Sequence, residues 1–280
     1  AAMLDATHGR DVGCLYDAPA VKGTFLSYVD NAPKKLKIAY TYEPLLRDGT
    51  IDSECLQGLQ ATVALLRDLG HEVVEASPPL DKKTLAEGYL LRIAAATAGE
   101  VLDSERILGR RMGMDDFETE TWSLARLGQS FNAGDLDYAN RQLYAQTRVF
   151  EQWMQQYDVF LTPTLAAPPV TFGEFHLKGI EKLLSPLAKR LPLGPLVHFL
   201  PVLSHLAAQS FQWVVSTPVM NITGNPSVSL PLHWTKDNLP VGMMFTARYG
   251  DDATLFSLAG QLEKALPWFH RRAGVFAGEK

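Results

Sequence analysis

The segments LKIAY (Leu36 to Tyr40) and HEVVEA (His71 to Ala76) are short, apolar and flanked by proline, which is typical of strands. Between them, apolar side chains recur every three or four residues from Leu56 to Leu69, and Gly70 ends this helical pattern. A strand, a helix and a strand at this spacing predict a βαβ unit with a locally parallel sheet. The unit has neither GxGxxG nor GxxxxGK[ST], so we interpret it as scaffold rather than as a nucleotide site.

The middle of the chain predicts helices. A helical pattern runs from Leu80 to Gln156, with breaks near Gly109 to Asp115 and near Asn132 to Asp135. The run DVFLT (Asp158 to Thr162) is short, apolar and followed by proline, which predicts a buried strand.

The C-terminal part predicts a hairpin and a last helix. Ser227 to Leu230 and Val241 to Ala247 have the composition of strands, and the polar residues Thr235 to Asn238 fit a turn between them. The candidate N-caps are Asp52 or Ser53 for the helix of the βαβ unit, Asp135 and Asp137 for a helix over 138–156, and Asp251 or Asp252 for the last helix. The chain is therefore predicted to be α/β, with strands concentrated at its two ends.

The composition excludes several classes of protein. The 280 residues are 46% hydrophobic and 20% charged, which is typical of a globular protein and not of a disordered or disulfide-framework chain. The net charge of −5 gives no electrostatic footprint for nucleic acid. The two cysteines, Cys14 and Cys55, lie far apart, which favours a reducing compartment and a cytoplasmic location.

The stretch from Leu191 to Thr235 contains no Asp, Glu, Lys or Arg. Pro192, Pro195 and Pro201 would break a membrane-spanning helix, so no transmembrane segment is expected. We expect a buried hairpin or helix pair that covers the core. The wall of an apolar substrate channel and a surface that rests on lipid are functional interpretations that stay open.

Most catalytic and metal-binding motifs are missing. The sequence has no HExxH, CxxC or GxSxG, and His198 and His205 are better explained as structural histidines than as metal ligands. No metal and no cofactor is therefore predicted. Helix capping explains the carboxylate pairs, which are Asp115 with Asp116 and Asp251 with Asp252.

The segment STPVMNITGNPSVSLP (Ser216 to Pro231) is charge-free and rich in small hydroxyl residues. Gly224-Asn225-Pro226 predicts a tight turn that leads into a strand and places Asn221 and Thr223 beside a cavity or backbone. A plain buried turn, in which an Asn side chain satisfies neighbouring backbone groups, explains the segment equally well.

Four blocks of the chain resemble the C-terminal half of amidase-signature hydrolases. MNITGNPSVSLP (Met220 to Pro231) is similar to the family's N-x-T-G-x-P-[AS]-x-S-[LV]-P. AAMLDATHGRDVG (Ala1 to Gly13), YDVFLTPTLAAPP (Tyr157 to Pro169) and LPVGMMFTARYGDDATLFSLAGQLE (Leu239 to Glu263) resemble three further blocks in the same order. The last block most resembles bacterial amidases of the 6-aminohexanoate cyclic-dimer hydrolase type.

The resemblance implies a mixed central sheet flanked by helices and an amide hydrolase with a Ser–cis-Ser–Lys triad. In that family a lysine acts as the base, one serine relays the proton, the other attacks the amide carbon, and a glycine-rich cradle stabilises the oxyanion. The chain contains no Gly-Gly or Ser-Ser dipeptide, and Lys22, Lys34 and Lys37 lie in the wrong context for the base. Met244 stands where the family often has Gln, which suggests a more apolar setting.

Residues 1–280 are therefore predicted to be the C-terminal portion of a single amidase domain. The start of the chain agrees, because Ala1 to Gly9 has the pattern of final helical turns without an N-cap. The catalytic residues would lie upstream, so the chain alone is predicted to be inactive and to need the missing N-terminal half as its partner.

The resemblance assigns Thr217, Met220 and Asn221 to the binding of a small-molecule amide substrate, and no residue of this chain to catalysis. A homo-oligomer is compatible with the sequence. The alternative is a non-catalytic binding or assembly module that keeps half of the fold. The amidotransferase branch is disfavoured, because no basic patch for tRNA is evident.

Overall fold

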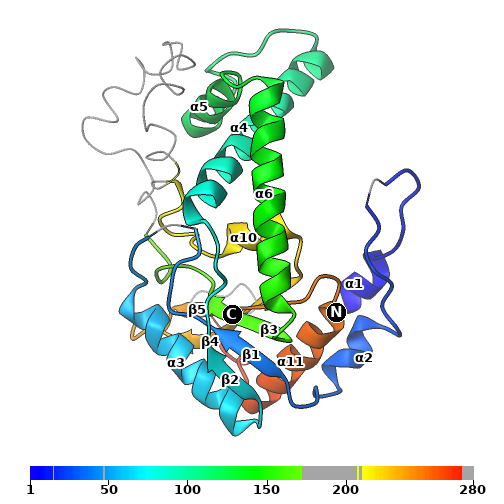
Figure 1. The fold of residues 1–280 in the computed structure, drawn as a ribbon, viewed down its shortest axis with the longest axis vertical. Coiled ribbons are helices and arrows are strands. Elements are labelled where there is room, and N and C mark those ends of the chain that lie inside the picture. Colours follow the sequence, from blue (N-terminus) through cyan, green and yellow to red (C-terminus); the bar gives the residue numbers. More distant parts are fainter. Residues whose placement is uncertain (15, 47, 172–206, 208–209, 273–280) are drawn as a thin grey trace, which may run out of the picture.

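The computed structural model describes residues 1–14, 16–46, 48–171, 207 and 210–272. In this part of the chain, five strands form one mixed sheet with the order β2-β1-β3-β5-β4 (Figure 1). The strands are β1 (Lys37–Tyr40), β2 (Glu72–Glu75), β3 (Val159–Pro163), β4 (Ser227–Trp234) and β5 (Pro240–Ala247).

The predicted βαβ unit is confirmed. β1 pairs in parallel with both β2 and β3, and α3 (Ser53–Asp68) connects β1 to β2. The Asp52 side chain caps α3 by accepting a hydrogen bond of 2.8 Å from the Glu54 N–H. β5 pairs antiparallel with β3 on one side and with β4 on the other, so the predicted C-terminal hairpin is also confirmed and is longer than expected.

One face of the sheet packs against α3 and α11 (Asp252–Ala265), through a core that includes Leu59, Phe245 and Leu258. Two short helices, α1 (Ala2–Thr7) and α2 (Phe25–Val29), lie beside α11 (Figure 1). Asp5 joins them, because its carboxylate accepts hydrogen bonds from the Phe25 N–H at 2.6 Å and the Leu26 N–H at 2.9 Å. The acidic residue of the first sequence block therefore caps the start of α2.

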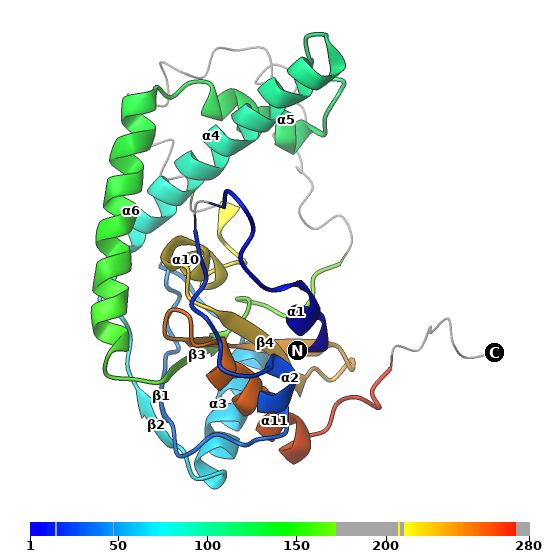
Figure 2. The ribbon, with the colours of Figure 1, turned by 90° about the vertical axis from the view of Figure 1, so that its right-hand side faces the viewer.

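The opposite face is covered by the remaining helices. The long helices α4 (Lys82–Leu108) and α6 (Ala133–Met154) extend away from the sheet, α5 (Thr119–Gly128) packs on α4 near its outer end, and α10 (Thr217–Thr223) lies between the helices and the sheet (Figure 2). Phe150 of α6, Phe160 of β3 and Met244 of β5 belong to the shared apolar core.

The caps predicted for α6 (Asp135 and Asp137) and the capping role predicted for Asp115 and Asp116 are wrong. α6 begins at Ala133, five residues earlier than expected, because Asn132 caps it and Asp135 occupies the third helical position of a capping box. Asp116 does not cap a helix either; Glu118 precedes α5, and Asp116 pairs with Arg110 at the end of α4. Asp251 caps α11 as predicted, by accepting from the Thr254 N–H.

The first part of the charge-free stretch, residues 191–206, with His198, His205 and the expected hairpin or helix pair, lies outside the described residues. Within the described part of the chain, none of the helices combines the length and the apolar composition that crossing a bilayer requires.

Candidate functional site

Three of the four sequence blocks come together in adjacent strands. The block from Tyr157 forms β3, the block from Met220 continues into β4, and the block from Leu239 forms β5. The carboxyl ends of the parallel strands β1 and β3 lie at the same edge of the sheet, where binding sites of α/β proteins usually occur.

Hydroxyl side chains share one face of these strands. In the antiparallel register Ser227 lies opposite Thr246, and Met244 lies opposite both Ser229 and Thr162. Directly opposed residues point to the same face of a sheet. The Ser227 and Thr246 hydroxyls lie 2.8 Å apart. We call this surface the hydroxyl face; its members are Thr162, Thr164, Ser227, Ser229 and Thr246.

Part of the hydroxyl face is buried in the core, and part of it is exposed to solvent. Thr162 and Thr246 lie in the core, whereas Ser227 and Ser229 on β4 are exposed. The Thr162 hydroxyl, 1% exposed as a residue, has no hydrogen-bond partner in the described part of the chain. β4 has a neighbouring strand only on its β5 side among the described residues, so the serines stand along a free edge.

Thr164 and Ser229 meet over a glycine. Their hydroxyls lie 2.6 Å apart, beside a hollow of about 180 Å³. A Cβ at Gly242 would lie 2.5 Å from Ser229 Oγ and 2.7 Å from Thr164 Oγ1, so only glycine leaves room for this contact. The contact between Thr164 and Ser229 thus explains why position 242 is a glycine.

Replacing Gly242 with Ala is expected to break the Thr164–Ser229 contact and to lower the free energy of unfolding by about 1–2 kcal/mol. Urea unfolding followed by circular dichroism would measure the loss. The Ser229→Ala background supplies the control, because it removes the collision with Ser229 Oγ and leaves the collision with Thr164 Oγ1 at 2.7 Å. If Gly242→Ala costs the same in both backgrounds, the collision with Ser229 is not its cause.

The predicted substrate-binding residues lie on a helix, whereas the sequence suggested a turn. Thr217, Met220 and Asn221 belong to α10, which contains Pro218 in its first turn and ends at Gly224, where φ is +80°. The turn that follows does lead into β4. There the Asn225 side chain donates a hydrogen bond of 3.0 Å to the Ala247 carbonyl oxygen, so the expected backbone role of an Asn is confirmed for Asn225.

The three residues differ in exposure. Met220 is 5% exposed and packs in the apolar core, Thr217 is half-buried, and Asn221 is exposed. Met244, 4% exposed, belongs to the same core as Met220, in agreement with the apolar setting expected for it.

Asn221 has a partner that the sequence did not indicate. Its Nδ2 donates a hydrogen bond of 3.2 Å to the Tyr89 hydroxyl on α4, 132 residues earlier in the chain. The Tyr89 ring packs at 5.8 Å, centroid to centroid, against Phe211. No local pattern marks Tyr89, because it sits within an ordinary helical stretch and acquires its role only when α4 and α10 meet.

Titratable groups near the sheet offer no nucleophile–base pair in the described part of the chain. Burial, with Asp52 and Glu54 nearby, raises the pKa of the Cys55 thiol to about 12, which suppresses the thiolate. His233 Nε2 lies 3.0 Å from Glu54 Oε2, an arrangement found in catalytic dyads, but no described hydroxyl or thiol is hydrogen-bonded to His233.

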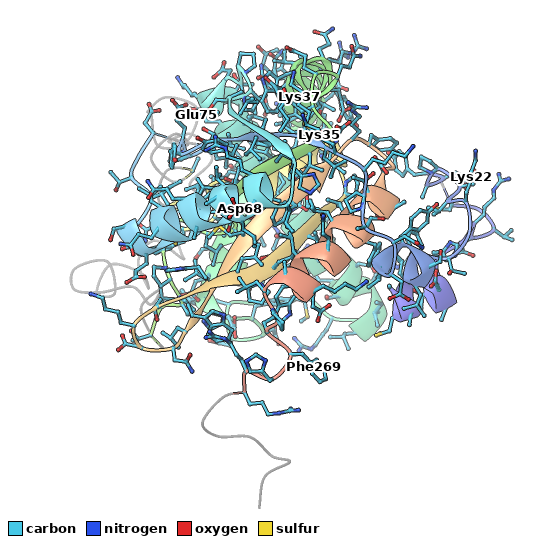
Figure 3. The ribbon with its side chains drawn as sticks, turned by 90° about the horizontal axis from the view of Figure 1, so that it is seen from below. Lys22, Lys35, Lys37, Asp68, Glu75 and Phe269 are labelled. Atoms are coloured by element: carbon cyan, nitrogen blue, oxygen red, sulfur yellow. The ribbon has the colours of Figure 1, made fainter. Side chains whose placement is uncertain are left out.

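Lys22 and Lys37 lie away from the hydroxyl face. Lys37 is at the start of β1, opposite to the end where Thr41 follows the strand, and its ammonium group lies 4.0 Å from Glu72 and over the Tyr157 ring. Lys22 lies at the periphery, in the loop before α2 (Figure 3). That Lys22, Lys34 and Lys37 do not serve as the family's base stays a prediction.

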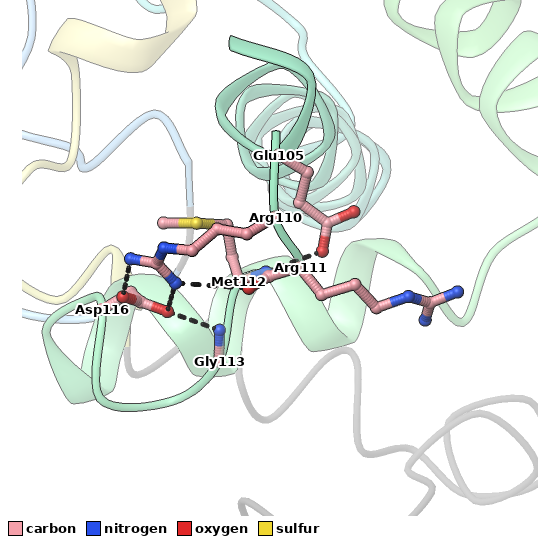
Figure 4. A network of polar contacts seen from close by, with 6 residues as sticks. All are labelled: Glu105, Arg110, Arg111, Met112, Gly113 and Asp116. Atoms are coloured by element: carbon pink, nitrogen blue, oxygen red, sulfur yellow. Dashed lines mark hydrogen bonds and ion pairs between the residues drawn. The ribbon is translucent and has the colours of Figure 1, made fainter. Parts of the chain in front are cut away.

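A two-bond ion pair between Arg110 and Asp116 holds the loop after α4. Arg110 holds both carboxylate oxygens of Asp116, at 2.6 and 3.1 Å, and the Gly113 N–H donates to the same carboxylate (Figure 4). These bonds lower the pKa of Asp116 to about 2 and close the loop after α4. Among the described residues, no group of three His, Cys, Asp or Glu side chains could hold a metal ion.

Comparison with known proteins identifies the family. Residues 1–256 match the family model described as Amidase. The chain belongs to the amidase family. The 6-aminohexanoate-cyclic-dimer hydrolase of Pseudomonas sp. (strain NK87) is 28% identical to it over 279 residues, which are 97% of this chain and 52% of that protein.

Solved structures agree on the fold. A structure of 6-aminohexanoate cyclic dimer hydrolase matches with a TM-score of 0.81 at 24% identity, over 97% of this chain and 53% of that one. A bacterial aryl acylamidase of the amidase signature family matches with a TM-score of 0.65 at 19% identity, over 89% and 47%. The chain thus spans about half the length of the amidases that it matches.

Proposed function

We propose that this chain forms the C-terminal portion of a cytoplasmic amide hydrolase and supplies its sheet scaffold and one wall of its substrate site. Membership of the amidase family carries the proposal. A segment outside the present sequence would supply the nucleophilic serine, the relay serine in a cis peptide, the lysine base and the glycine-rich cradle. The serine would attack the amide carbon, the lysine would accept its proton through the relay serine, and water would then release the acyl group.

The free edge of β4 supports a partner segment. Its outer side is unpaired in the described part of the chain. A groove of about 430 Å³ lies beside it on the face that packs against α11, and its lining is mostly apolar, with Ser227, Asp252 and Glu263 as polar members. An unpaired strand edge next to an apolar groove readily accepts another strand. We propose that the segment with the nucleophile packs here, which would bring it beside Ser227, a residue that lines the groove.

Substrate contact is proposed for the three residues of α10. Asn221 and Thr217 offer polar groups at the surface of the chain, and Met220 forms part of the apolar floor beneath them. The relative from Pseudomonas is named for the cyclic dimer of 6-aminohexanoate. We therefore propose uncharged linear or cyclic carboxamides with apolar spacers as the substrate class.

The proposal predicts that the isolated chain does not hydrolyse acetanilide or 6-aminohexanoate cyclic dimer, because no described residue provides an activated nucleophile. The same chain, joined to or co-expressed with the proposed upstream segment, should release aniline or open the cyclic dimer. Release of aniline followed by absorbance, and the linear dimer followed by chromatography, would measure both reactions.

The control is the joined protein with the nucleophilic serine of the upstream segment replaced by Ala, which should be inactive and folded. Turnover by the isolated chain would overturn the proposal. A folded joined protein that hydrolyses no amide would favour a binding or assembly module instead.

A further inference from the structure

We propose that Tyr89 and Asn221 together recognise a second carboxamide of the substrate, distinct from the amide bond that is cleaved. The inference rests on the proposed function and specifies its substrate class. It concerns a carboxamide whose N–H and C=O point to the same side, as in a primary amide or a cis amide.

The pair joins two helices that come from distant parts of the sequence. Tyr89 lies on α4 and Asn221 on α10, and the hydrogen bond of 3.2 Å between them fixes the relative position of the phenol and the carboxamide. Asn221 is exposed and Tyr89 is half-buried, so the pair sits where the core meets the surface. Two polar groups held in a fixed geometry at such a boundary can orient a ligand without large losses of side-chain entropy.

The pair retains hydrogen-bonding capacity of both kinds. The Tyr89 oxygen accepts from Asn221 Nδ2, so the phenolic hydrogen stays available to donate. Asn221 Oδ1 stays available to accept, since neither side chain has a further hydrogen-bond partner among the described residues. A donor next to an acceptor is complementary to a carboxamide, whose carbonyl oxygen would accept from Tyr89 and whose N–H would donate to Asn221.

The surroundings favour a neutral ligand. Phe211 packs on the Tyr89 ring. Met220, which precedes Asn221 on α10, lies in the same apolar core as Phe211. On α4, three of the four side chains one turn from Tyr89 are apolar, namely Leu85, Ala86 and Ile93; the fourth, Arg92, is exposed. The charge-free sequence around Asn221 supplies no counter-ion, so an amine would lose hydration without gaining an ion pair from α10.

The test uses Tyr89→Phe in the joined protein described above, with a matched pair of anilides. One is the monoanilide of adipamide, which carries a terminal primary carboxamide; the other is heptananilide, in which an alkyl end replaces it. For Tyr89→Phe we expect kcat/KM to fall about tenfold for the first substrate and to stay within about twofold for the second, because one hydrogen bond is lost in only one of the two complexes.

Tyr138→Phe is the matched control. Tyr138 is a 65% exposed tyrosine on α6 with no hydrogen-bond partner among the described residues, so Tyr138→Phe should leave kcat/KM unchanged for both anilides. If Tyr89→Phe lowered kcat/KM equally for both anilides, Tyr89 would only support the fold. If it changed kcat/KM for neither anilide, Tyr89 would not contact the substrate. Either result overturns the inference while leaving the proposed function intact. If the joined protein cleaves neither anilide, the proposed function fails first and the inference falls with it.

Discussion

Gly128→Ala is expected to lower the free energy of unfolding by about 3 kcal/mol, at the upper end of the usual cost of overpacking. Gly128 ends α5, where that helix crosses α4. A Cβ built there would lie 1.9 Å from the Ala94 carbonyl oxygen and 2.4 Å from its carbonyl carbon. Both atoms belong to the backbone of α4, so they cannot rotate away as a side chain could. The two helices must separate, which exposes part of the apolar surface between them.

Gly99→Ala on α4 is the matched control for this prediction. A Cβ at Gly99 meets no atom within 4 Å, and alanine is the better helix former, so this variant should gain about 0.5–1 kcal/mol. Urea unfolding of both variants, followed by circular dichroism, measures the two opposite shifts. Equal stability of Gly128→Ala and the wild-type chain would mean that α5 does not pack on α4 as described.

The elements that local chemistry specifies were predictable. The strands of the βαβ unit and the helix between them follow from apolar periodicity, and Asp52 marks the start of α3. α10 was missed because a seven-residue helix with Pro218, Val219, Met220 and Ile222 all buried shows no polar face and therefore no helical period.

The candidate site was predictable only where it is contiguous in sequence. The blocks that contain Thr164 and Ser229 were recognisable as motifs, but their contact over Gly242 depends on the register of β3, β4 and β5. The Tyr89–Asn221 bond likewise depends on how α4 and α10 pack. Such contacts are set by tertiary structure, which periodicity and composition do not encode.

His71→Leu is expected to cost about 3 kcal/mol, because it removes two hydrogen bonds from a buried side chain and leaves a backbone N–H and an amide without their partners. His71 is 6% exposed. Its Nδ1 accepts from the Leu36 N–H at 3.1 Å, which requires the ring hydrogen on Nε2, where it donates to Gln261 Oε1 at 2.9 Å. The imidazole therefore connects the start of β1 to α11, and 190 residues separate His71 from Gln261.

Two further variants separate these contributions. In His71→Asn the side-chain oxygen can take the place of Nδ1, so the bond to the Leu36 N–H is kept and only the link to Gln261 is lost; about half of the effect should remain. In the cycle formed with Gln261→Leu, the double variant should be about 1 kcal/mol more stable than the sum of the single losses predicts, since the second substitution removes a group that the first left unpaired. Strict additivity would show that the His71–Gln261 bond contributes nothing, and that any loss in His71→Leu arises at Leu36. Coupling would instead show that the His71–Gln261 bond links α11 to the βαβ unit and contributes to the stability of the folded chain.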